Sequence, residues 1–259
     1  MHPPVDTDDL EQALDQAAAL LRRAASVAVL TGAGVSAESG VATFRGAGGL
    51  WEGHAVEDVA RPMAFRRDPA LVWRFYHARR AALRAVRPNP GHLALAAMED
   101  RWGSDRFTLI TQNVDGLHRA AGSRHVVEVH GTLARVRCTG CGQSEDTTAD
   151  LPELPRCGAC GALLRPAVVW FHEMLPAAEW AEAARAAAQC QAFLVVGTSA
   201  IVYPAAGLID VARSAGAAVI EVNIEPTAAA GRGAVRLRGP SGVLLPQLVE
   251  RLLAGDEGG

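Results

Sequence analysis

The spacing of apolar residues predicts alternating helices and strands along most of the chain. In the segment 8–26, Leu10, Leu14 and Leu21 recur at helical spacing between acidic residues at the start and arginines near the end, so a first helix is expected there. Short apolar runs predict buried strands at SVAVLTGAG (26–34), FTLIT (107–111), HVVEVHG (125–131), AFLVVGTS (192–199), AAVIEVN (217–223) and GVLLP (242–246). Helical patterns at 178–190 and 204–216 separate the later strands. This order predicts an α/β fold with a Rossmann-like parallel sheet and helices on both faces.

Two segments interrupt the alternation. Residues 131–166 contain four cysteines and few periodic apolar positions, and residues 40–90 contain helical patterns separated by prolines. The predicted organisation is therefore a Rossmann-like domain made of residues 8–39, 91–130 and 167–252, a helical insertion with a loop at 40–90, and a small metal-binding module at 131–166.

Composition narrows the classes of function. The chain has 259 residues, of which 49% are hydrophobic and 20% charged, and its formal net charge is −3. No basic stripe suggests nucleic-acid binding, and no apolar run approaches the length that spans a membrane. The N-terminal segment lacks the pattern of a secretory signal, so a cytoplasmic location is expected. All 25 basic residues are arginines.

The four cysteines of residues 131–166 form two Cys-x-x-Cys pairs, Cys138 with Cys141 and Cys157 with Cys160, separated by fifteen residues. This spacing is typical of a tetrahedral zinc site, and four thiolates leave no open position, so one structural zinc per chain is expected. Two disulfides are the alternative and fit poorly with a chain lacking an export signal. A zinc ribbon can also bind nucleic acid, but this module has no aromatic residue on which a base could stack. The fifth cysteine, Cys190, is expected to be a buried apolar residue.

Glycine-rich and polar motifs follow the predicted strands, at the sheet edge where open parallel sheets bind ligands. They are TGAGVSAESGVATFRGAGGLW (31–51), TQNVDGLH (111–118), EVHG (128–131), GTSAIVYPAA (197–206) and VNIEP (222–226). In this order, with the four cysteines between them, these motifs resemble the sirtuins, which are NAD-dependent protein-lysine deacylases. The resemblance extends from about Ser26 to Leu245.

The resemblance implies an NAD site and a catalytic pair. Displacing nicotinamide from the ribose requires a closely held acyl-lysine oxygen and then a base that deprotonates a ribose hydroxyl. The base of the family falls on His130, with Asn113 as its catalytic partner. A lone histidine or asparagine at these positions could equally be structural. The residues implied to bind NAD are Gly32, Ala33, Gly34, Ser36, Phe44, Arg45, Trp51, Gln112, Asn113, Val114, Asp115, Gly197, Thr198, Ser199, Asn223, Ile224, Glu225 and Ser241.

The resemblance also implies how a substrate is bound. Val168, Val169, Trp170 and Phe171 would pair with an extended acylated protein or peptide by strand addition. Ala42, Ala167 and His172 depart from the usual family pattern. The products would be nicotinamide, O-acyl-ADP-ribose and free lysine. The oligomeric state is not predicted.

The segment LVWRFYHARRAAL (71–83) carries a further signal. Tyr76 and Arg79 are three residues apart, so on a helix they share a face and could hold one small anion. The alternative is that Tyr76 packs and Arg79 is solvated. In the desuccinylase-like branch of sirtuins, a Tyr-x-x-Arg pair binds the distal carboxylate of succinyl- or malonyl-lysine. Ala60 and Thr43 also follow that branch, and Arg80 is the alternative partner.

Three functions are therefore compared. The first is deacylation of succinyl- or malonyl-lysine, with acetyl-lysine as a further substrate. The second is mono-ADP-ribosyl transfer or simple NAD hydrolysis in the same cleft, and the third is a non-catalytic module that senses NAD or uses the zinc ribbon to bind nucleic acid. Acetyl-lysine deacetylation is the alternative to the acidic acyl preference.

Overall fold

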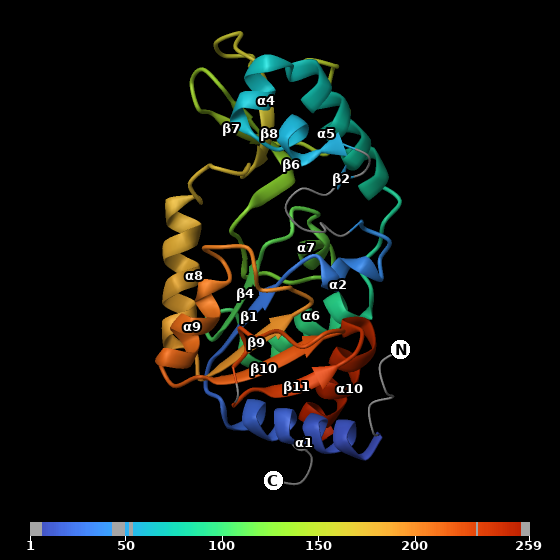
Figure 1. Ribbon diagram of the computed structural model, residues 1–259, viewed down its shortest axis with the longest axis vertical. Helices are drawn as coiled ribbons and strands as arrows, with labels where there is room; N and C mark the ends of the chain where they lie inside the picture. The colour runs from blue at the N-terminus through green and yellow to red at the C-terminus, as the bar shows by residue number, and fades with distance from the viewer. Residues whose placement is uncertain (1–6, 43–49, 52–53, 232, 255–259) are drawn as a thin grey trace.

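The computed structural model describes residues 7–42, 50–51, 54–231 and 233–254, arranged as a larger lobe built on a parallel sheet and a smaller lobe above it (Figure 1). The sheet has six strands, all parallel, in the spatial order β11 (Val235–Arg238), β10 (Ala218–Asn223), β9 (Ala192–Val196), β1 (Val27–Thr31), β4 (Phe107–Thr111) and β5 (Val126–Glu128). This is the Rossmann strand order. The prediction of a Rossmann-like parallel sheet is confirmed.

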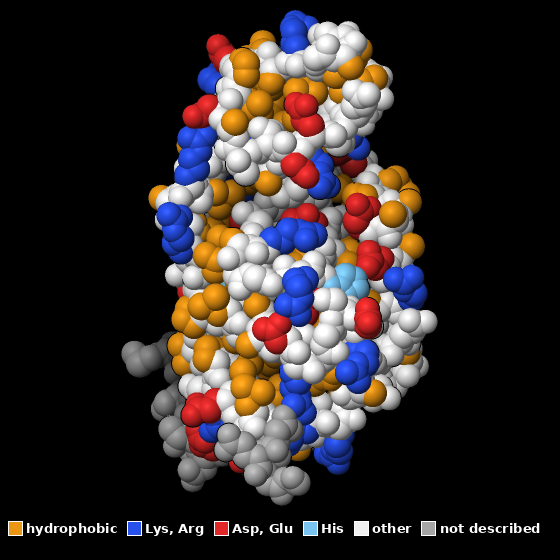
Figure 2. Space-filling model, turned by 180° about the vertical axis from the view of Figure 1, so that it is seen from behind, with side chains coloured by type: hydrophobic (Ala, Val, Ile, Leu, Met, Phe, Trp, Pro, Cys, Tyr) orange, Lys and Arg blue, Asp and Glu red, His pale blue; other side chains and the backbone are white. Residues whose placement is uncertain are grey.

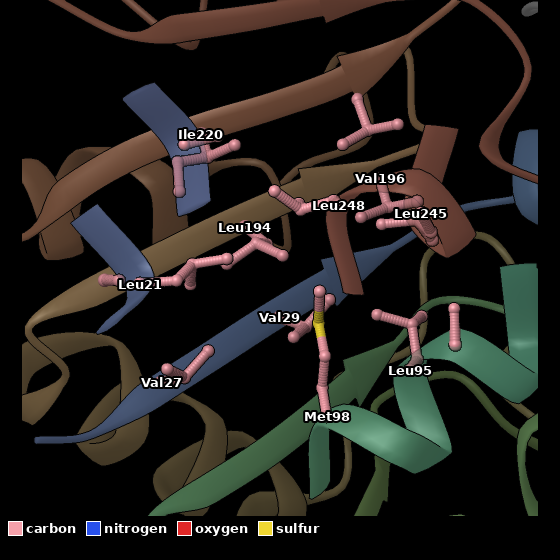
Figure 3. Close-up of a cluster of buried hydrophobic side chains, with 14 of the residues drawn as sticks. Leu21, Val27, Val29, Leu95, Met98, Leu194, Val196, Ile220, Leu245 and Leu248 are labelled. Atoms are coloured by element: carbon pink, nitrogen blue, oxygen red, sulfur yellow. The ribbon is translucent and has the colours of Figure 1, made fainter. Parts of the chain in front are cut away.

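Helices cover both faces of the sheet, as the sequence predicts. One face carries α1 (Thr7–Arg23), α6 (Pro90–Trp102) and α10 (Ser241–Ala254), and the other carries α8 (Ala177–Gln189) and α9 (Gly207–Ser214) (Figure 1). On the first face, leucines of α1, α6 and α10 pack with Met98 against strand residues such as Val29, Leu194 and Ile220 (Figure 3). β1 and β9 are buried at every position, which explains their unbroken apolar runs.

The smaller lobe combines short helices with a three-stranded antiparallel sheet. Its helices are α3 (Val56–Val59), α4 (Pro62–Arg67) and α5 (Pro69–Leu83). Its strands lie in the spatial order β7 (Ser144–Asp146), β6 (Gly131–Cys138) and β8 (Leu164–Val168). A two-stranded ribbon, β2 (Leu50–Trp51) with β3 (His54–Ala55), precedes α3. The short helices α2 (Gly34–Ala37) and α7 (Leu117–Ala120) follow β1 and β4. Asp68 caps α5, because its carboxylate accepts the Leu71 N–H at 2.9 Å.

One predicted strand is wrong. Residues 242–246 form the first part of α10, and the sheet instead ends with β11, which alternates buried Val235 and Leu237 with arginines. A five-residue apolar run does not distinguish a strand from a buried helix segment. The carboxylate of Glu38 accepts the Gly242 N–H at 2.8 Å and so satisfies a backbone donor at the start of α10.

No described helix is long and apolar enough to cross a bilayer. On the face seen in Figure 2, basic and acidic side chains are interspersed over both lobes, and no continuous basic stripe is visible.

Candidate active site

The strand order reverses between β1 and β9, and the loops after these two strands contact one another there. A Cβ on Gly34 would lie 2.6 Å from the carbonyl oxygen of Gly197, and one on Gly197 would lie 2.3 Å from the Val35 nitrogen. Only glycine permits this approach at either position. The predicted glycine loop therefore lies at the crevice where doubly wound sheets bind nucleotides.

A buried polar network fixes the residues below this crevice. The His92 Nδ1 atom accepts the Asn89 N–H at 3.3 Å, so its Nε2 carries the proton and donates to the Ser36 hydroxyl at 3.3 Å. The Asn113 amide donates to the same hydroxyl at 3.2 Å, and the hydroxyl donates to the Asp115 carboxylate at 2.8 Å. Both lone pairs and the hydrogen of Ser36 are thus engaged. Ser36 positions Asn113 and Asp115, and its predicted contact with NAD stays a prediction.

A second layer of this network was not predicted from the sequence. His118 contacts the Thr31 hydroxyl at 3.0 Å, and Thr31 donates to Thr111 at 2.8 Å. The rings of His92 and His118 lie 4.8 Å apart. Burial, together with the neighbouring His92, lowers the pKa of His118 to about 3. Burial also lowers the pKa of His92, whose Nδ1 accepts a backbone N–H, so both histidines act as neutral supports. His118 stands inside the TQNVDGLH motif, which was the signal that could have identified it.

His130 lies just beyond β5 with its ring oriented by a backbone group. Its Nδ1 is 3.0 Å from the carbonyl oxygen of Gln112, and because a carbonyl only accepts, Nδ1 carries the hydrogen. Nε2 then holds the free lone pair. Burial lowers the pKa of His130, and the bond to Gln112 offsets only part of that effect. The imidazole is thus held as a neutral base near the same strand ends as Asn113.

A tight connection joins His130 to residues 168–171, which are predicted to pair with the substrate peptide and are called the substrate strand, although β8 itself ends at Val168. Gly131 has φ = +75°, and a Cβ there would lie 2.0 Å from the Ala167 carbonyl oxygen, so the EVHG motif requires its glycine. The Val169 N–H donates to the His130 carbonyl at 2.8 Å, and the Phe171 N–H donates to the Ala60 carbonyl at 3.0 Å.

The segment after the substrate strand begins with an unusual backbone. His172 adopts φ = +70°, a left-handed conformation that residues other than glycine adopt rarely. Val168 and Trp170 are buried, whereas Phe171 is exposed.

The remaining predicted cofactor residues gather at the same sheet edge. Gln112 donates to the Thr198 hydroxyl at 3.1 Å, and Asn223 donates to the Thr198 carbonyl at 2.7 Å. Ser199, Ile224 and Glu225 are exposed there, and Val114 is partly buried. Ser241 begins α10 and donates to Glu38 at 3.2 Å. Thr43, Phe44, Arg45 and the side chain of Trp51 lie outside the described residues, so their roles stay predictions.

Tyr76 and Arg79 both point into the core of the smaller lobe. Tyr76 is 1% exposed and Arg79 is 7% exposed, so the alternative that Arg79 is solvated is wrong. Burial raises the pKa of Tyr76 to about 12, although the positive charge of Arg79 acts to lower it, so the phenol is neutral. Arg80 is partly buried and is also anchored to the protein. Its guanidinium donates to the carbonyl oxygens of Leu133, Thr147 and Ala149, which ties α5 to the cysteine module.

The four cysteine sulfurs converge as the metal prediction requires. All four Sγ atoms lie within 4.8 Å of one another, with 3.4 Å between Cys138 and Cys160 and 3.8 Å between Cys141 and Cys157. Tetrahedral zinc with thiolate bonds of about 2.3 Å separates its sulfurs by about 3.8 Å. The sulfurs are too far apart for disulfides, which need about 2.05 Å. The donor set fits a structural zinc. Cys190 lies apart from this cluster and is buried against α8 and α9, as expected.

Comparisons with known proteins agree with this site. Residues 32–204 match the model of the Sir2 family. The chain is 50% identical over 234 residues to NAD-dependent protein deacylase 2 of Pyrobaculum aerophilum. The alignment covers 90% of this chain and 93% of that protein. It also resembles an ADP-ribose complex of a Sir2 homologue mutant at 40% identity and a TM-score of 0.88, covering 94% of this chain and 98% of that one. A further similar structure is that of Sir2Af2 bound to a myristoylated histone peptide, with 35% identity and a TM-score of 0.76. The superposition covers 96% of this chain and 100% of that one. The chain belongs to the Sir2 family, the sirtuins.

Proposed function

We propose that this sirtuin is an NAD-dependent protein-lysine deacylase that removes succinyl and malonyl groups, and acetyl groups as a further activity. The relative from Pyrobaculum aerophilum is named as an NAD-dependent protein deacylase, and Sir2Af2 is described with an acylated peptide, which supports NAD and acylated peptides as the reactants. The observation that carries the acidic preference is the buried Tyr76–Arg79 pair. The two side chains share one face of α5, and a guanidinium beside a neutral phenol is suited to bind the carboxylate of an acyl chain.

The residues of the crevice fit NAD and the reaction. NAD, when bound, would supply the anomeric carbon for attack by the acyl oxygen and nicotinamide as the leaving group. Asn113 and Asp115 are held rigidly by Ser36, which suits them to orient the nicotinamide ribose. His130 is held with Nε2 unprotonated, so it can accept the proton of a ribose hydroxyl. The substrate strand next to His130 brings the acyl-lysine to the same place.

Arg79 would pair with the distal carboxylate, and the Tyr76 hydroxyl would donate a further hydrogen bond. A hydrogen bond to a charged group contributes about 1.5 to 3 kcal/mol, or roughly ten- to a hundredfold in preference. We therefore expect Arg79→Met to lower kcat/KM for a succinyl-lysine peptide by that factor relative to the acetyl-lysine peptide of the same sequence. Both peptides are assayed by mass spectrometry with and without NAD. An equal loss on both peptides, or a wild-type enzyme that ignores succinyl peptides, would return the pair to a structural role.

Mono-ADP-ribosyl transfer and NAD hydrolysis use the same cofactor residues with a different acceptor. They are distinguished in the same assay, because deacylation alone yields O-acyl-ADP-ribose together with free lysine. Loss of NAD without loss of the acyl group would favour the second function.

The pH dependence follows from the burial of His130. A lowered pKa keeps the imidazole neutral, and hence basic, to lower pH than an exposed histidine near 6.5. We expect kcat/KM for the acetyl peptide to stay constant as pH falls through 6.5 and to decline only below it. The acetyl peptide avoids titration of a substrate carboxylate, and tryptophan fluorescence checks folding over the same range. An acidic limb centred above pH 6.5 would contradict this expectation.

A further inference from the structure

A second layer of side chains lies behind the Tyr76–Arg79 pair. The indole N–H of Trp170 donates to the Tyr76 hydroxyl oxygen at 2.9 Å, and both side chains are buried. Trp170 belongs to the substrate strand, whereas Tyr76 belongs to α5. This hydrogen bond therefore joins the predicted peptide-binding segment to the predicted acyl-recognition helix.

Trp170 is itself held in one orientation. The Arg165 guanidinium carbon lies 3.3 Å from the centroid of the Trp170 ring, and Phe65 packs on Trp170 with 5.4 Å between ring centroids. Arg165 is 6% exposed and donates two hydrogen bonds to the Glu173 carboxylate, at 2.6 and 2.9 Å. The same carboxylate accepts the backbone N–H of Trp170 at 2.8 Å.

The charge of this support is balanced. Burial raises the pKa of the Glu173 carboxyl, but the hydrogen bonds from Arg165 and from the Trp170 backbone outweigh it, so the pKa lies below its ordinary value. Glu173 therefore stays ionised opposite Arg165. A planar guanidinium between a carboxylate and an indole face is a rigid arrangement that lysine would not reproduce.

The hydrogen-bond capacity of a phenol makes this arrangement directional. A tyrosine hydroxyl has one hydrogen and two lone pairs, and an indole N–H is a donor only. Once Trp170 donates to the oxygen of Tyr76, the hydrogen of Tyr76 points away from Trp170. Accepting one hydrogen bond also strengthens the next donation along the chain. Tyr76 is thereby prepared to donate, which suits a carboxylate.

We propose that Trp170 is a positioning residue for acidic acyl groups, acting through the Tyr76 hydroxyl and held in place by Arg165 and Glu173. This inference rests on the proposed function and adds to it the residues that orient the acyl-binding phenol. It makes selectivity depend on the substrate strand as well as on α5.

The test is a double-mutant cycle on the ratio of kcat/KM for succinyl and acetyl peptides of one sequence. Trp170→Phe keeps an aromatic ring but loses the indole N–H, and we expect it to lower the ratio roughly three- to tenfold, chiefly through the KM of the succinyl peptide. In the Tyr76→Phe background there is no oxygen to orient, so adding Trp170→Phe is expected to leave the ratio unchanged. Arg165→Lys keeps the charge opposite Glu173 but loses the planar group that stacks on Trp170. It should also lower the ratio, and it replaces Trp170→Phe in the test if that variant does not fold.

Trp73 offers a matched control. It lies on α5, three residues before Tyr76, is fully buried and donates its indole N–H to the Leu164 carbonyl at 2.9 Å. Trp73→Phe should cost stability without changing the ratio. A ratio unaffected by Trp170→Phe, or an effect that persists in the Tyr76→Phe background, overturns the inference. If Arg79→Met is selective while Trp170→Phe is not, only this inference fails; if the wild-type enzyme ignores succinyl peptides, both proposals fail.

Discussion

His130→Ala is expected to lower the rate of NAD-dependent deacylation by about 100- to 10,000-fold, the usual contribution of a general base. The loss follows from the geometry, because the Gln112 carbonyl holds the ring with Nε2 unprotonated beside the residues that would orient the nicotinamide ribose. The variant loses the hydrogen bond from His130 Nδ1 to the Gln112 carbonyl, and its folding and zinc content should remain close to those of the wild type.

His125→Ala is the matched control for this experiment. His125 is also partly buried and precedes β5, at the opposite end of that strand from His130, where its ring contacts the Ser104 carbonyl and Glu182. Its replacement should cost stability but little activity. The measurement is single-turnover deacylation at saturating NAD, with circular dichroism as the check on folding. A folded His130→Ala enzyme with near-normal turnover would remove His130 from the mechanism.

Most of the sheet could be predicted because its central strands are buried on both faces. The runs VAVLT and AFLVV are buried at every position and apolar except at Thr31, and both strands lie inside the predicted segments 26–34 and 192–199, each ending three residues before its segment does. β11 was missed because it lies at the sheet edge and alternates with arginines, while the apolar start of α10 resembled a strand. Edge elements and short apolar runs carry weaker signals than central strands.

The site was predictable to the level of motifs but not of contacts. Sequence spacing placed Tyr76 and Arg79 on one face, yet it could not show that both are buried, or that Arg80 is anchored on three backbone carbonyls. The contact of His92 with Ser36 joins positions 56 residues apart, and that of Trp170 with Tyr76 joins positions 94 apart. Each contact lies within one lobe and depends on how elements far apart in the sequence pack there, which no local pattern encodes.

Removing the metal is expected to have the second large effect. Zinc in small four-ligand modules contributes an apparent binding free energy of about 10 to 16 kcal/mol, which is folding free energy for the segment that holds it. The three strands of this module have little apolar core of their own. Cys138 and Cys157 lie in the same buried cluster as Tyr76, Leu164 and Trp170, so loss of the metal should also disturb acyl recognition.

We therefore expect one zinc per chain by elemental analysis, and a lower melting temperature after chelation or in Cys157→Ser. Cys190→Ser is the matched control, because Cys190 is buried to a similar extent in a different cluster and should leave the zinc content unchanged. A protein without metal whose five cysteines all titrate as thiols would contradict the zinc prediction. Because β8 continues directly into Val169, which donates to the His130 carbonyl, partial loss of zinc should lower deacylation before the parallel sheet unfolds.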